Sequence, residues 1–338
     1  MLELVNDTPF AAAILPGLDK EGVQNATVIV KGTFLLPAAG ANDPTIAEEQ
    51  VPIVGAAEYY GDPEKTSIRY DTDMVPAKPG TDVVLVGCAR SARPLPALDV
   101  TLAVGPLKKT VRVFGERRWS RTLGHWSASK PQPFVEMPLV YERAFGGWDT
   151  SHDKAEKHDW EPRNPVGTGF NISGDKELLD GMSLPNLEDP ADLIGGRKDR
   201  PKPAGFGFVG PNWKPRVDFA GTYDQKWLDS RAPLLPDDFD DRFFNSAHPD
   251  LIAPRHLAGG EAVAVSNVSK AGPLRFAVPR QTLEIEVTMR GQSSRHTPRL
   301  DTLLIEPDAN RAVLCWRVTF PCPNQFLYIE TIRVRGQA

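Results

Sequence analysis

The sequence predicts a mainly β protein made of antiparallel, β-sandwich-like lobes, with few short helices. Its 338 residues include 32 prolines and 28 glycines, and both residue types interrupt or weaken helices. The periodic segments that remain alternate apolar with polar residues or are short apolar runs, as strands are. They flank a long, loop-rich middle that is rich in Pro, Gly and aromatic residues. Two β lobes, or one large sandwich decorated by the middle, both fit this pattern.

The N-terminal strands come first along the chain. Residues Thr27–Leu36, TVIVKGTFLL, form the first convincing strand. The block Asp82–Trp119 predicts a meander of three strands, DVVLVGCA, DVTLAVG and KTVRVFGERRW, with Pro and Gly residues between them. Val111 and Val113 alternate with polar residues, which predicts one solvent-facing side for the third strand. The spacing of these strands suits a sandwich or a barrel.

Strands return after an aperiodic middle. GGEAVAVSNVS, GPLRFAVP and TLEIEVTMR each predict a strand, and Asp301–Phe320 predicts a hairpin with its turn at Pro307–Asn310. We therefore expect an N-terminal β lobe at residues 1–124 and a loop-rich central region at 125–258. The C-terminal strands at 259–338 are expected to pack with the N-terminal lobe as one compact unit.

Charge and apolar patterning narrow the partners and the location. The 39 basic and 44 acidic residues give a net charge of −5, and no long basic run is present, so we expect no nucleic-acid partner. No apolar run approaches the ~18 residues of a membrane helix, and the N-terminus has no basic n-region. We expect no membrane insertion and a cytoplasmic location. The three cysteines lack C-x-x-C spacing and predict buried, reduced thiols.

None of the cofactor, metal or catalytic motifs that we considered has the flanking elements or spacing that it requires. Gly205–Gly210, GFGFVG, matches a dinucleotide fingerprint, but Pro211 and Pro215 follow it where a helix would be needed. Walker, H-E-x-x-H, G-x-S-x-G and zinc-type Cys/His spacings are absent. The sequence therefore predicts no cofactor, no metal and no enzymatic activity.

The most unusual stretch is 213–250, which combines two tryptophans, four phenylalanines and a tyrosine with many aspartates. A calcium loop starting at Asp238 would place Arg242 and Phe243 where an oxygen ligand and a glycine are required, so the EF-hand pattern fails. A carboxylate site of another kind stays an alternative, as does helix capping by the acids. Rings beside paired carboxylates also leave open a carbohydrate-binding or carbohydrate-active β protein.

Eight segments, in order along the chain, resemble one protein family. They are KPGTDVVLVGCARS, VRVFGERRW, MPLVYERAFGG, NPVGTGF, PAGFGF, W-x-PR…AGTYD-x-x-W, LLPDDFDDRFFN and CWRVTFP. Together they resemble the DUF2169 family, from VNDTPF near the N-terminus to Thr319. The resemblance implies a bacterial type VI secretion role. Members of the family are encoded beside VgrG or PAAR spike proteins and toxic effectors, and the resemblance implies that this chain is a non-enzymatic adaptor or chaperone that helps load an effector onto the spike.

The resemblance also marks candidate residues in 213–250, with two interpretations for them. In the first they are structural: Arg216 and Arg242 pair with nearby aspartates, and the rings close the core between lobes. In the second, their exposed members contact the effector or the spike protein. A further class of function is that of an immunity protein, which would bind the toxin and neutralise it. The candidates are Trp213, Arg216, Tyr223, Asp224, Trp227, Asp238, Phe239, Asp240, Arg242, Phe243 and Asn245.

Overall fold

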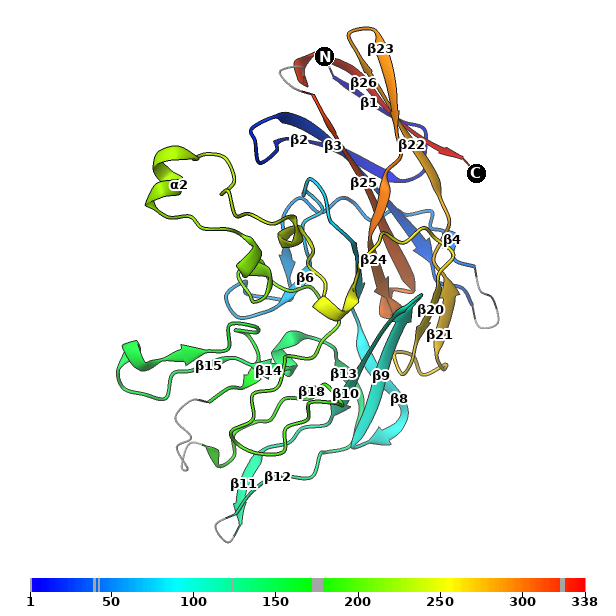
Figure 1. Cartoon of the computed structure of the whole chain (residues 1–338). Helices are drawn as coiled ribbons and strands as arrows, with labels where there is room; N and C mark the ends of the chain where they lie inside the picture. The colour runs from blue at the N-terminus through cyan, green and yellow to red at the C-terminus, as the bar shows by residue number, and fades with distance from the viewer. Residues whose placement is uncertain are drawn as a thin grey trace.

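The computed structural model describes residues 2–38, 41, 43–122, 125–171, 179–322 and 326–337, and it confirms a mainly β protein. Figure 1 shows three large sheets along one side of the molecule. The loop-rich chain from about residue 125 to 258 covers the other side, with α2 at its outer end. Most strand pairs are antiparallel, as predicted. Among the described strands, β1–β26, β7–β24 and β14–β17 are parallel pairs.

A seven-stranded sheet forms the centre of the fold. Its longest strand, β3, is buried on both faces over nearly all of its length, because TVIVKGTFL is apolar or β-branched at almost every position. The predicted hairpin at Asp301–Phe320 is confirmed as two neighbouring strands of this sheet. In spatial order the strands are β19 (Ile252–Ala253), β7 (Thr81–Leu85), β24 (Arg299–Glu306), β25 (Arg311–Pro321), β3 (Gln24–Leu35) and β2 (Ala11–Leu18), with β4 (Thr45–Ile46) also paired to β3.

Two further sheets lie at either end of this one (Figure 1). In β9 every second residue is buried, which is the alternation that one solvent-facing side predicts. The five-stranded sheet is, in order, β18 (Leu187–Glu188), β10 (Leu107–Phe114), β9 (Ala97–Val104), β20 (Ala262–Val265) and β21 (Leu274–Ala277). The four-stranded sheet is β1 (Glu3–Asn6), β26 (Ile329–Gln337), β22 (Thr282–Met289) and β23 (Gln292–His296).

The predicted meander is wrong at its first strand. β9 and β10 pair with each other, but β7 belongs to the seven-stranded sheet, where it runs parallel to β24. All five residues of β7 are buried, as in a strand covered on both faces. The next strand along the chain, β8, was not predicted, and it pairs with β13 instead of β7. The closeness of these strands in sequence suggested that β7 pairs with its neighbours along the chain, but a strand that is buried on both faces belongs inside the seven-stranded sheet.

Short strand pairs and helical turns make up the rest. The pairs are β5 (Glu58–Tyr59) with β6 (Ile68–Tyr70), β8 (Cys88–Leu95) with β13 (Phe134–Pro138), β11 (Trp119–Thr122) with β12 (His125–Ala128), β14 (Phe145–Gly146) with β17 (Thr168–Gly169), and β15 (Trp148–Asp149) with β16 (Asp159–Trp160). The α-helix of the described chain is α2 (Gln225–Ser230), and single 3-10 turns lie at Tyr141–Arg143, Ala155–Lys157, Arg216–Phe219, Asp241–Phe244, Pro249–Leu251, Pro307–Ala309 and Phe326–Tyr328. In the part of the chain that the structure describes, no helix has the length and apolar character needed to cross a membrane.

One hydrophobic cluster joins the three large sheets. At its centre the rings of Phe10, Phe34 and Trp316 pack with centroids 5.7–6.4 Å apart. Each large sheet combines strands from the first 124 residues with strands from beyond residue 259, apart from the two-residue strands β18 and β19. The three cysteines form no disulfide; Cys315 and Cys322 are buried as predicted, whereas Cys88 is only partly buried. Burial raises the pKa of the Cys315 thiol to about 12, which makes this thiol unreactive.

Candidate functional site

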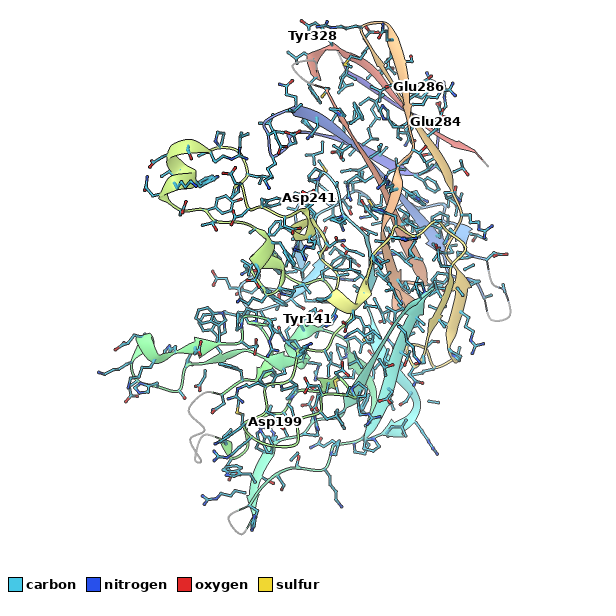
Figure 2. The ribbon with its side chains drawn as sticks, in the orientation of Figure 1. Tyr141, Asp199, Asp241, Glu284, Glu286 and Tyr328 are labelled. Carbon is cyan, nitrogen blue, oxygen red and sulfur yellow. The ribbon has the colours of Figure 1, made fainter. Side chains whose placement is uncertain are left out.

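Residues 213–250, which we call the signature segment, divide into a buried root and an outlying arm. The arm is residues 221–237, which carry α2 away from the sheets (Figure 1), and the root is the remainder. Figure 2 places Asp241 of the root beside the core, above Tyr141. Among the candidates, Trp213, Arg216, Phe239 and Asn245 are buried, Trp227, Asp240 and Phe243 are partly buried, and Tyr223, Asp224, Asp238 and Arg242 are exposed.

Arg216 fixes the root to the rest of the protein. Its Nη1 lies 2.8 Å from Asp71 Oδ2 and donates to the Val209 carbonyl, also at 2.8 Å. Its Nε donates to the Phe243 carbonyl at 2.9 Å, with the guanidinium over the Phe243 ring. A buried guanidinium needs such partners, because an unpaired charge in the interior is costly. The partner carboxylate comes from outside the signature segment.

Asn245 enters a buried ionic network beneath the root. Its Nδ2 donates to Asp82 Oδ1 at 2.8 Å and to the Gly80 carbonyl at 3.0 Å. Asp82 is fully buried, and its Oδ2 accepts from Lys78 Nζ at 2.8 Å and from the Ser246 backbone at 2.9 Å. Although burial opposes it, the charges of Asp82 and Asp301 raise the pKa of Lys78. Lys78 is therefore a buried, charged ammonium.

The network continues across β24 and β25. Lys78 Nζ donates to Thr302 Oγ1 at 3.0 Å, and Thr302 donates to its neighbour Asp301. Asp301 forms an ion pair with Arg317, whose other nitrogen donates to the Asp73 carbonyl. A chain of alternating charges thus ties β7, β24 and β25 to the root.

Three candidate acids of the signature segment, Asp224, Asp238 and Asp240, are used in capping and pairing. Asp224 caps α2 by accepting from the Trp227 backbone at 2.9 Å, and Asp238 accepts from both the backbone and the hydroxyl of Thr222. Asp240 caps the turn at Asp241–Phe244 and accepts from the Arg242 guanidinium at 2.6 and 3.0 Å. Hydrogen bonds from Thr222 and Arg242 respectively lower the pKa values of Asp238 and Asp240. The described residues contain no group of three or more His, Cys, Asp or Glu arranged to hold a metal.

Glycines allow the root to pack closely against Tyr141. The Trp213 ring meets Tyr141 edge-on at 5.6 Å. A Cβ on Gly205 would lie 2.7 Å from the Tyr141 ring, and one on Gly210 would lie 2.9 Å from Trp213. The GFGFVG segment is therefore a packing element that pairs with the root, since Val209 donates to the Ser246 carbonyl at 2.7 Å.

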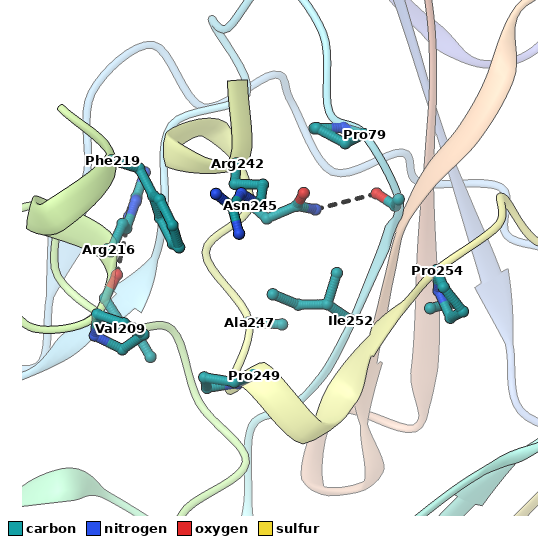
Figure 3. Close-up of a pocket in the computed structure, with 13 residues that line it drawn as sticks. Pro79, Val209, Arg216, Phe219, Arg242, Asn245, Ala247, Pro249, Ile252 and Pro254 are labelled. Carbon is teal, nitrogen blue, oxygen red and sulfur yellow. Dashed lines mark hydrogen bonds between the residues drawn. The ribbon is translucent and has the colours of Figure 1, made fainter. Parts of the chain in front are cut away.

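The root also borders an apolar pocket of about 310 Å³, which residues outside the root help to line (Figure 3). Phe219, Ala247 and Ile252 face its centre, and prolines form much of its rim. Arg242 contributes the stem and guanidinium at one side, held over the Phe219 ring at 4.2 Å. The pocket adjoins β19, the edge strand of the seven-stranded sheet. Its size is at the lower end of the range for ligand pockets.

A second pocket, of about 470 Å³, lies on the other side of Val209, Pro215 and Pro249, which line both. Its walls include Lys109, Arg163, Lys202 and Lys214 as cations, with Asp189 and Asp250 as acids. His248 also lines it. Burial lowers the pKa of His248 to about 4, and the charge of Lys109 acts in the same direction. The positive charge of this pocket at pH 7 therefore comes from Lys and Arg.

The buried imidazole makes stability depend on pH. Because the folded-state pKa of His248 lies below its ordinary value of 6.5, the unfolded state binds more protons between pH 6.5 and 4, and stability falls as pH falls through this window. The shift corresponds to about 3 kcal/mol at most. In His248→Gln, which keeps an acceptor for the Asp250 amide, the free energy of unfolding should fall less steeply. Urea titrations at pH 7, 6, 5 and 4.5 measure this, and equal slopes for both proteins would contradict it.

Sequence reasoning missed most of the residues beneath and beside the signature segment. Lys78 and Asp82 lie inside the KPGTDVVLVG segment, where an acid directly before a fully apolar strand is a signal of a buried, paired carboxylate. Asp71, Asp301 and Arg317 carry no comparable local signal. The second pocket combines residues from 109 to 250, which only the folded chain brings together.

A family model matches the chain over residues 21–317, a range that contains the whole signature segment and both pockets. Its description is "Uncharacterized protein conserved in bacteria (DUF2169)". Neither the curated proteins nor the solved structures contain a match to the chain.

Proposed function

Since the chain belongs to the DUF2169 family of bacterial proteins, we propose that it is a non-enzymatic adaptor or chaperone of a type VI secretion system. It acts in the cytoplasm, where it helps to load a toxic effector onto the VgrG or PAAR spike protein. The observation that carries the proposal is the arm, which presents apolar side chains to solvent at a distance from the core.

Three features make the arm suitable for docking. Tyr223 and Leu228 are 54% and 57% exposed, respectively. Tyr223 stands edge-on to Trp227 at 4.8 Å, and Trp227 Nε1 donates to the Leu234 carbonyl at 2.8 Å, so the rings hold the arm's shape. Arg231 anchors the arm by donating to the Lys20 carbonyl at 2.6 Å. A preorganised surface loses little conformational entropy on binding, and exposed aromatic residues are typical anchors of protein interfaces.

A partner-capture experiment tests the arm. The protein is co-expressed with the products of its neighbouring genes, among which the proposal expects a spike protein and an effector, and analysed by size-exclusion chromatography. We expect a stable complex for the wild type. The double variant Tyr223→Ala with Leu228→Ser should bind the partner about tenfold or more weakly, because interface anchors contribute about 1–2 kcal/mol or more each. Thermal unfolding should be nearly unchanged, since both side chains are exposed.

The matched control is Leu327→Ser, which removes a 94% exposed leucine beside Tyr328, at the top of Figure 2 and away from the arm. This variant should bind like the wild type. If the arm variant still forms the complex, the arm is not the docking surface; if no neighbouring product binds the wild type, the adaptor role is wrong.

The arrangement of the acids favours an adaptor over a carbohydrate-active enzyme. A glycosidase of the common kind needs a carboxylic acid whose pKa is raised so that it stays protonated, whereas hydrogen bonds from Thr222 and Arg242 lower the pKa values of Asp238 and Asp240. Sugar binding that is lost in Asp238→Asn would reverse this preference. Protection of cells that express the toxin together with this chain would instead favour an immunity protein.

A further inference from the structure

The two pockets of the root adjoin and differ in chemistry. They share Val209, Pro215 and Pro249 as a common wall. The first is lined mainly by apolar side chains, and its two buried polar members, Arg216 and Asn245, are already hydrogen-bonded inside the protein. What it offers a ligand is therefore chiefly an apolar surface.

Among the residues that line the second pocket, cations outnumber carboxylates, although Glu161 and Asp218, which do not line it, pair with two of these cations and the chain as a whole carries −5. The pocket walls hold four cations against two carboxylates, and His248 is neutral at pH 7. Lys109 Nζ lies 2.8 Å from Asp250 Oδ2. Arg163 is held at 2.6 and 2.7 Å by both oxygens of Glu161.

Two lysines remain to face a ligand. Lys202 is exposed and forms no direct ion pair with a carboxylate of the described residues. Although burial opposes it, the hydrogen bond and charge of Lys109 and, more weakly, the charge of Lys202 lower the pKa of Asp250 in the same pocket. Lys214 is half-exposed, and its Nζ lies 3.6 Å from Asp218 Oδ1. This distance is long for an ion pair, and such a surface contact contributes little to stability. These ammonium groups stand at a partly enclosed surface, where a charge pair is stronger than in open water.

We propose that the adjoining pockets form one bipartite site for an extended segment of a protein partner. An apolar side chain of that segment occupies the first pocket, and one or two carboxylates a residue or two along it face Lys202 and Lys214 in the second. The inference rests on the proposed adaptor function, because it names the kind of partner segment that such an adaptor would hold.

Size and charge select this ligand. The first pocket suits one large apolar side chain better than a drug-sized molecule. An extended chain advances about 3.3 Å per residue and its side chains alternate between two faces, so side chains two residues apart point the same way and can enter pockets that share a wall. The Arg163 guanidinium is already engaged by Glu161, so the cations left for a ligand are lysines, which act as point charges. The carboxylates of an acidic segment supply the counter-charge for them.

Labelled peptides test the site without altering the protein. The first is a short fluorescein-labelled peptide with one leucine followed by two glutamates in a Gly/Ser background. The second replaces both glutamates by glutamine, and the third replaces the leucine by serine. Fluorescence anisotropy with the full chain should show the first binding about tenfold or more tightly than either other peptide, with affinity that falls as salt rises. No binding by the first, or equal binding by all three, would overturn the proposal.

Protein variants then locate the site. Lys202→Glu should weaken the first peptide about tenfold while leaving the glutamine peptide unchanged, and Phe219→Ser should weaken both leucine peptides. Lys65→Glu, at a 78% exposed side chain outside both pockets, is the control and should bind like the wild type. Thermal unfolding of each variant separates misfolding from lost contact. Unchanged binding in folded Lys202→Glu and Phe219→Ser would place the peptide elsewhere and refute the site.

Partner capture separates this inference from the adaptor function. If the wild type and both pocket variants capture the co-expressed spike or effector equally while no peptide binds, the bipartite site is wrong and the adaptor role stands. If the peptides behave as expected but no neighbouring product is captured, the site stands and the adaptor role is wrong.

Discussion

Replacing Asp82 by alanine should lower the free energy of unfolding by about 3–5 kcal/mol, because it leaves the Lys78 ammonium buried without its nearest counter-charge. The same change removes the acceptor of the Asn245 amide and of the Ser246 backbone, so the root loses its attachment to β7. Urea denaturation at pH 7 measures the loss. A surface pair offers the matched control, since Asp237 is 73% exposed beside Arg231, and Asp237→Ala should cost less than about 1 kcal/mol.

A second substitution shows whether the charge is responsible. In the double variant Asp82→Ala with Lys78→Met, no unpaired charge is buried, and a large part of the lost stability should return. The cycle of single and double variants gives the coupling energy of the pair. A coupling close to zero would mean that Asp82 acts only through its bonds to Asn245 and Ser246.

Trp213→Ala should be nearly as damaging, with a loss of about 3–5 kcal/mol. Trp213 is only 5% exposed and fills the space between Tyr141 and Gly210, so its removal leaves a cavity in the core. Far-UV circular dichroism and urea denaturation measure the effect. A loss below about 1 kcal/mol would mean that the root closes around the missing ring.

The other tryptophan of the same segment provides the contrast. Trp227→Ala removes the ring contact with Tyr223 and the bond to the Leu234 carbonyl, which are both contacts within the arm. We expect the arm to loosen and the unfolding midpoint to change little, with partner capture weakened. Equal destabilisation by Trp213→Ala and Trp227→Ala would contradict the division into root and arm.

The strands of this protein could be predicted because their signals are local. TVIVKGTFLL, the Asp301–Phe320 hairpin and the alternation in 97–114 specify strands through their own periodicity. The pairing of β7 could not be predicted in the same way. Its apolar run fits a central strand of any sheet, and its partner β24 lies more than two hundred residues later in the sequence.

The candidate site could be predicted only in part, because its contacts also join residues that are distant in sequence. The sequence marked Arg216 and Asn245, but it could not show that their partners are Asp71 and Asp82, because burial of a charge depends on what folds over it. Nor could composition show that Tyr223 projects while Phe239 is buried, because both lie in an aperiodic segment dense in rings and acids. The bipartite pocket joins residues of several loops, and no spacing along the chain encodes it.

In the seven-stranded sheet, strands that the ribosome makes last lie between strands that it makes early. β24 and β25 separate β7 from β3, and Thr81 donates to the carbonyl of Leu300, 219 residues away in sequence. Until β25 has emerged, β3, which has ten residues that are buried in the folded protein, has one open edge, and an open edge is the kind of surface that pairs with other chains. The seven-stranded sheet can therefore close only after translation has passed residue 321, and until then this edge stays available for pairing with other chains.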